Sequence, residues 1–152
     1  MNTNPFAIPG HLPKGAKILF ANVPADGHFN PLTGLAVHLK KEGYDVRWYA
    51  SHRYAAKIEK LGIPHYPSKT ALDVDLEKAE ELFPDRDKHK TQIAKLNFDI
   101  INVFILRGPE YYADLRAIYQ SFPFDVMVAD ITFGAIPLVK EHMKIPVLSV
   151  GI

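Results

Sequence analysis

The 152-residue sequence contains no cysteine, which excludes disulfide frameworks, cysteine-based zinc sites and thiol nucleophiles. It also has no run of about 18 apolar residues, so we expect no membrane span. The opening stretch MNTNPFAIPGHLPKG lacks the apolar core of a secretory signal, and we interpret residues 1–15 as a flexible leader. The absence of cysteine agrees with a reducing compartment, and we expect a cytoplasmic protein.

Charge of one sign is not in excess either. The net charge is +1, with lysine and arginine spread along the chain, so we expect no nucleic-acid partner. The sequence has no GxxxxGK[ST] loop, and its GHFNP stretch lacks the further glycines of a dinucleotide fingerprint. The seven histidines show no metal-ligand spacing. We therefore expect neither a bound cofactor nor a metal.

Short apolar runs alternate with helical patterns along the rest of the chain. The runs predict five strands, at residues 16–23, 44–50, 63–67, 124–130 and 145–151. Nearly all-apolar strands separated by helices indicate a parallel sheet that is covered on both faces. We predict an α/β fold: one doubly wound, mainly parallel Rossmann-like domain over residues 16–152, with strand order about 3-2-1-4-5.

The helices are predicted from their apolar spacing and their end signals. The first is expected to begin with Asn30 as its N-cap and Pro31 as its first helical residue, and to end at Gly43. A charged loop is expected at residues 84–90, and a break at Gly108-Pro109. The other helices are predicted at residues 52–62, 72–83, 91–108, 109–122 and 132–144.

His28 is the first candidate for chemistry. It follows Gly27 in the turn after the first predicted strand, at the sheet edge where open α/β folds bind their ligands. The positive end of the following helix disfavours an imidazolium and so favours the neutral form that a general base requires. A polar loop residue without a catalytic role is the alternative.

Asp130 is the second candidate, at the end of the fourth predicted strand. The first and fourth strands are neighbours in the predicted order, so Asp130 can accept a hydrogen bond from one His28 ring nitrogen. Such a carboxylate fixes the imidazole tautomer and stabilises the imidazolium that forms on proton abstraction. Alternatively, Asp130 caps the next helix, with Thr132 nearby.

Two segments of the sequence carry a family resemblance. AKILFANVPADGHFNPLTGLAVHLKKEGYDVRWYAS and FDVMVADITFGAIPLVKEHMKIPVLSV resemble the GT-B family 1 glycosyltransferases, the UDP-glycosyltransferase and macrolide glycosyltransferase group. The resemblance implies the N-terminal, acceptor-binding half of an inverting glycosyltransferase. His28 would deprotonate the acceptor hydroxyl, and Asp130 would be its partner. A nucleotide-sugar donor would bind mostly to a C-terminal domain that this sequence does not contain.

The resemblance also suggests an acceptor pocket. The family lines this pocket with apolar side chains of the middle helices, for a small, largely apolar acceptor. The candidates here, each of which could equally be ordinary helix core, are Phe29, Phe98, Ile101, Phe104 and Ile105.

Two alternatives stay open at this point. The chain could be a non-catalytic Rossmann-like module that binds a small molecule or a partner, or the acceptor subunit of a split two-chain glycosyltransferase. As the acceptor half, it is expected to transfer no sugar by itself. We also expect some self-association, because a sheet ending at its fifth strand exposes an edge.

Overall fold

The computed structural model describes residues 12–73 and 79–151 of the chain. Its centre is a sheet of five parallel strands in the order β3-β2-β1-β4-β5, as predicted. The strands are β1 (Lys17–Ala21), β2 (Asp45–Ala50), β3 (His65–Pro67), β4 (Val126–Asp130) and β5 (Val147–Val150). Because all strands run in one direction, their carboxyl ends share one edge of the sheet.

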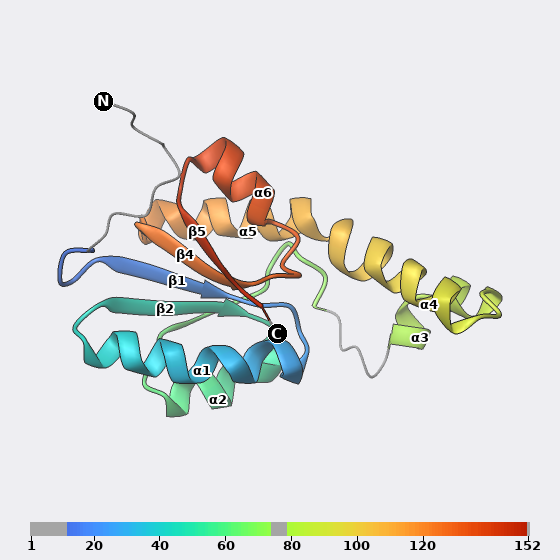
Figure 1. Cartoon of the computed structure of the whole chain (residues 1–152), viewed down its shortest axis with the longest axis horizontal. Coiled ribbons are helices and arrows are strands. Elements are labelled where there is room, and N and C mark those ends of the chain that lie inside the picture. The colour runs from blue at the N-terminus through green and yellow to red at the C-terminus, as the bar shows by residue number, and fades with distance from the viewer. Residues whose placement is uncertain (1–11, 74–78, 152) are drawn as a thin grey trace.

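Helices cover both faces of this sheet (Figure 1). One face packs against α1 (Asp26–Lys41), η1 (His52–Tyr54) and α2 (Ala55–Lys60), and the other against α5 (Gly108–Ser121), α6 (Ile136–Leu138) and η5 (Val139–Met143). Between β3 and α5 the chain forms α3 (Ala79–Leu82), η3 (Pro84–Lys88), α4 (Gln92–Asp99) and η4 (Ile100–Ile105). The end of this segment that carries α3 and α4 projects beyond the sheet (Figure 1).

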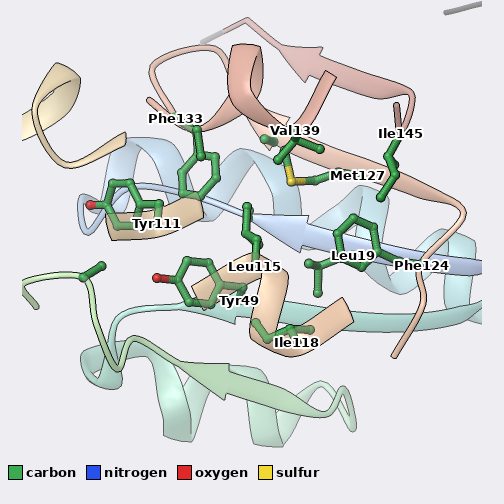
Figure 2. Packing of buried hydrophobic residues seen from close by; sticks show 14 of the residues in the cluster. Leu19, Tyr49, Tyr111, Leu115, Ile118, Phe124, Met127, Phe133, Val139 and Ile145 are labelled. Atoms are coloured by element: carbon green, nitrogen blue, oxygen red, sulfur yellow. The ribbon is translucent and has the colours of Figure 1, made fainter. Parts of the chain in front are cut away.

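The alternation of side chains along the strands divides the core into two clusters. In β1, Leu19 and Ala21 belong to the cluster under α5 and α6, whereas Ile18 and Phe20 belong to the one under α1 and α2. Figure 2 shows the first cluster, with Tyr111, Leu115 and Ile118 of α5 packed against the sheet and Phe133 beside them. Since the strands are buried on both faces, their apolar runs are nearly continuous.

The start of α1 differs from the prediction. The helix begins at Asp26, five residues earlier than expected, and Pro31 lies inside it. Asn30 is therefore not the N-cap; that position is Ala25, whose carbonyl accepts hydrogen bonds from the backbone N–H groups of His28 and Phe29, both at 3.0 Å. A proline in the second turn removes one backbone bond, which this well-packed helix tolerates.

The middle of the chain differs in detail. The charged loop predicted at 84–90 is largely the 3₁₀ helix η3, and the predicted helix at 91–108 changes from α4 into the π-helix η4. The break at Gly108-Pro109 is confirmed as the start of α5, with the proline in its first turn. Of the helix predicted at 72–83, residues 74–78 lie outside the described part, as do residues 1–11 of the predicted leader.

Within the described ranges, no helix combines the length and the apolar character that crossing a membrane requires.

Candidate functional site

A buried asparagine, Asn22, holds the turn between β1 and α1 in place. The Asn22 side-chain oxygen accepts a hydrogen bond from the Trp48 indole N–H at 2.7 Å, and its amide nitrogen donates to the Val23 carbonyl at 2.7 Å. Asn22 and Trp48 are both buried, so these bonds satisfy polar groups that water cannot reach. The turn is thereby held in one conformation, and His28 follows it in the first turn of α1.

Asp130 ends β4 on the face that α1 covers. It has the same strand parity as Val126 and Val128, which pack in the α1 cluster. The carboxylate is fully buried and is compensated by hydrogen bonds. Its Oδ2 accepts from the Val23 backbone N–H at 2.9 Å, and its Oδ1 accepts from the Thr132 backbone N–H at 2.9 Å and from the Thr132 hydroxyl at 2.5 Å.

His28 completes this arrangement. Its Nδ1 lies 3.1 Å from Asp130 Oδ1 and 3.2 Å from Thr132 Oγ1. An ionised carboxylate can only accept, so Nδ1 carries the proton and Nε2 of the neutral ring keeps its lone pair. About a quarter of the His28 side chain (23%) is exposed, whereas Asp130 is fully enclosed. The pair has the geometry of a base and its orienting carboxylate.

Asp130 contacts His28, but it does not cap the next helix, because the N-cap of α6 is Ala135. The same carboxylate that binds His28 also accepts from the backbone and hydroxyl of Thr132, two residues further along the chain. It therefore both organises the turn that leaves β4 and faces the imidazole.

The His28 ring lines an apolar groove of about 730 Å³ at the carboxyl edge of the sheet. The Phe104 ring lies 6.4 Å from the imidazole, centroid to centroid. Among the described residues that line the groove, His28 is the one titratable side chain, and Thr132 and Ser149 are the other polar ones. The remaining lining residues are Leu96, Ile100, Phe104, Ile105, Ile131, Phe133, Gly134, Ile136 and Pro137.

The five apolar residues that we selected from the sequence are divided by the structure. Phe104 and Ile105 line the groove. Phe29 lies outside it: its ring stacks on Tyr54 at 4.2 Å in the core under α1. Phe98 contacts Phe83 and His89 near the end of the projecting segment.

Ile101, the fifth, is half-exposed and does not line the groove. Phe104 and Ile105 end the π-helix η4, and Phe104 lies beside the His28 ring.

Sequence reasoning missed the other wall of the groove, which the chain forms between Ile131 and Pro137. A backbone contact positions this wall. A Cβ added to Gly134 would lie 2.5 Å from the Phe104 carbonyl oxygen, and one added to Gly108 would lie 2.7 Å from the Gly134 carbonyl oxygen. Two glycines, close in space and far apart in sequence, therefore allow the walls to approach. Glycine itself was the available signal, but its partner could not be inferred.

Within the described ranges, no group of three or more histidine, aspartate or glutamate side chains is placed to hold a metal ion.

The parallel sheet and the residues at its carboxyl edge define a Rossmann-like α/β domain with a histidine–aspartate pair beside an apolar groove. By sequence and by fold, this domain is a relative of the GT-B family 1 glycosyltransferases. The chain is 35% identical over 133 residues to 4'-demethylrebeccamycin synthase of Lentzea aerocolonigenes, which covers 88% of the chain and 31% of that protein. It is 27% identical over 128 residues to the NDP-glycosyltransferase YjiC of Bacillus licheniformis, covering 84% and 30% respectively.

Solved structures agree on the fold. The glycosyltransferase of kitacinnamycin matches with a TM-score of 0.67 and 23% identity over 92% of this chain and 31% of that one. SsfS6 of Streptomyces sp. SF2575 matches with a TM-score of 0.70 and 20% identity over 90% of this chain and 39% of that one. No protein-family model matches the chain. The chain spans about a third of the length of the curated relatives that it matches.

Proposed function

We propose that the chain is the acceptor-binding domain of an inverting glycosyltransferase, with His28 as its general base. The observation that carries this proposal is the contact between His28 Nδ1 and the buried Asp130, at 3.1 Å, in the wall of an apolar groove. A groove of this size that is lined by apolar side chains suits a small, largely apolar acceptor. The His28 imidazole is the titratable group among the described residues of the groove, and we propose that the acceptor hydroxyl lies beside it.

The proposed reaction is a single displacement. His28 Nε2 removes the proton from the acceptor hydroxyl, and the oxygen attacks the anomeric carbon of a nucleotide sugar. The bond from that carbon to the diphosphate breaks as the new C–O bond forms, so the nucleoside diphosphate leaves and the configuration inverts. Asp130 keeps the Nδ1 proton in place and stabilises the imidazolium until the ring loses its extra proton to solvent.

The donor is proposed to bind a second domain. One structural neighbour, SsfS6, was solved in complex with thymidine diphosphate, which belongs to that protein. Holding base, acceptor and donor together accounts for about 7–11 kcal/mol of rate acceleration in well-oriented reactions. We therefore propose that the 152-residue chain alone transfers no sugar. Purified chain incubated with nucleotide sugars and phenolic or macrolide acceptors is expected to give no product by mass spectrometry.

The base assignment is tested in the two-domain enzyme that contains this sequence. Replacing His28→Ala is expected to lower kcat about 10²–10⁴-fold, the usual contribution of a positioned base, and Asp130→Asn is expected to lower it through the wrong tautomer. His38→Ala is the matched control, because His38 is an exposed histidine on the same helix. A fall of less than about tenfold for His28→Ala would show that His28 is not the base. Acceptor binding with no turnover, unchanged by Asp130→Asn, would favour a non-catalytic binding module.

A further inference from the structure

Thr132 touches both members of the dyad. Its hydroxyl lies 3.2 Å from His28 Nδ1 and hydrogen-bonds Asp130 Oδ1, while its backbone N–H donates to the same carboxylate oxygen at 2.9 Å. Capping the turn after β4 requires only the backbone contact. The position of the hydroxyl between the imidazole and the carboxylate therefore calls for its own explanation.

The direction of the hydrogen bonds follows from the chemistry of the three groups. The Asp130 carboxylate can only accept, so the Thr132 hydroxyl proton points to Oδ1. The hydroxyl oxygen keeps its lone pairs and can accept from the His28 Nδ1 proton. That proton is then shared between two acceptors, Asp130 Oδ1 at 3.1 Å and Thr132 Oγ1 at 3.2 Å.

We propose that Thr132 is a positioning residue of the dyad: its hydroxyl shares the Nδ1 proton of His28 with Asp130 and so directs Nε2 to the groove. The proposal rests on the role proposed above for His28. The hydroxyl also places a further donor on Asp130, which draws carboxylate charge away from the imidazole. Thr132 thus holds the ring in one tautomer and moderates how strongly Asp130 stabilises the imidazolium.

Few charged or titratable groups surround His28 in the described part of the chain. Asp130 faces the ring from β4. On α1 itself, Asp26 is half-exposed and lies 3.5 Å from Lys57 Nζ. From α5, Tyr111 interacts with Asp130, but burial and then the Asp130 charge raise its pKa, so its hydroxyl stays neutral. The described lining residues from η4, the 131–134 loop and α6 carry no charge.

The test uses NMR of the 152-residue chain with ¹⁵N-labelled histidine, and it needs no turnover. Thr132→Val keeps the shape of the side chain and the backbone bond but removes the hydroxyl. We expect the Nδ1 proton of His28 to shift downfield, because it then binds Asp130 alone.

Two controls separate this role from simple packing. Thr132→Ser keeps the hydroxyl and is expected to restore the wild-type Nδ1 proton resonance. Thr33→Val removes a hydroxyl that bonds the Asn30 carbonyl on α1, away from the dyad, and is expected to leave that resonance unchanged. If Thr132→Val unfolds the chain, Thr132→Ala and Thr132→Ser are compared instead.

The proposal is overturned if the hydroxyl-free variants leave the Nδ1 proton resonance unchanged, or shift it upfield. It is overturned equally if Thr132→Ser shifts it as far as Thr132→Val, because the methyl group would then be responsible. These outcomes are independent of the turnover of His28→Ala, so a failure of the proposed function and a failure of this role can be told apart.

Discussion

The backbone contact between Gly108 and Gly134 leads to a prediction in which the same substitution has opposite effects at two helical glycines. Gly108 is the first residue of α5 and is buried against the Gly134 carbonyl. Gly34 lies in the exposed middle of α1, and a Cβ added there meets no heavy atom within 4 Å. Neither glycine has the positive φ that disfavours alanine, so the room available for the new Cβ decides whether the substitution stabilises or destabilises the chain.

Gly108→Ala is expected to destabilise the chain. The new Cβ would lie 2.7 Å from the Gly134 carbonyl oxygen and 3.1 Å from its carbon, both backbone atoms that a side-chain rotation cannot move. Relief requires the 131–137 wall to shift as a unit, at about 1–3 kcal/mol, the usual cost of overpacking. For a chain of this size that corresponds to a fall in Tm of about 2–12 °C.

Gly34→Ala is the matched control, and it is expected to stabilise α1 by about 0.5–1 kcal/mol because glycine lowers helix propensity. Thermal and urea unfolding followed by circular dichroism at 222 nm measure both variants against wild type. Gly108→Ala that unfolds at or above the wild-type temperature would refute the steric reasoning. In that case the walls of the groove would be separate enough to admit a methyl group, and their spacing would have another cause.

Further predictions concern the hydrogen bonds of Asp114 and the apolar groove. Asp114, buried on α5, accepts from the Tyr49 hydroxyl at 2.7 Å and from the backbone N–H groups of three consecutive loop residues, 69–71, at 2.7–3.2 Å. Asp114→Asn is expected to lower the free energy of unfolding in urea by about 2–4 kcal/mol, because the amide nitrogen of asparagine is a donor that faces the donors around Asp114. Asp125→Asn, at an exposed carboxylate, is the control. An equal loss of stability in Asp125→Asn would contradict the role given to the Asp114 hydrogen bonds. Burial raises the pKa of Asp114, but the hydrogen bonds outweigh it and hold the folded-state pKa below its usual range. Its stabilisation is therefore complete above the unfolded pKa of about 3.9 and is lost as the pH falls through the folded pKa, so the Asp114→Asn deficit should shrink in acid and should not grow. In the proposed two-domain enzyme, Ile105→Asp is expected to raise the KM for an apolar acceptor about tenfold or more with a smaller change in kcat. Ile93→Asp, also exposed but outside the groove, should leave the KM unchanged.

The interior of the sheet was predictable because it depends on local pattern. Five apolar runs separated by helical spacing specify parallel strands, and right-handed crossovers then restrict their order to few possibilities. The positions of His28 and Asp130 follow from the same facts, since each comes just after or at the end of a strand and the two strands are neighbours. Their 3.1 Å contact therefore follows from strand order combined with the parity of Asp130 in β4.

The start of α1 is a different case. Asn30 followed by Pro31 is a strong local signal for a helix beginning, yet the helix begins at Asp26. Phe29 and Leu32 pack in the core, and the helix begins five residues before the start that the cap signal indicates. Tertiary packing outweighed a local preference here, as it often does for single residues.

The groove was decided by the tertiary structure. Helical spacing of 3.6 residues per turn predicts one apolar face for residues 91–108, but the chain becomes a π-helix over Ile100–Ile105, whose wider turn rotates later side chains away from that face. Phe104 and Ile105 thus line the groove, while Ile101 does not. The opposite wall depends on a backbone contact between Gly108 and Gly134, and no periodicity in the sequence connects two residues so far apart. The sequence by itself therefore determined the strand order and the two ends that carry the dyad, because local periodicity encodes them. The shape of the groove beside the dyad was left to long-range packing, which arises only once the chain has folded.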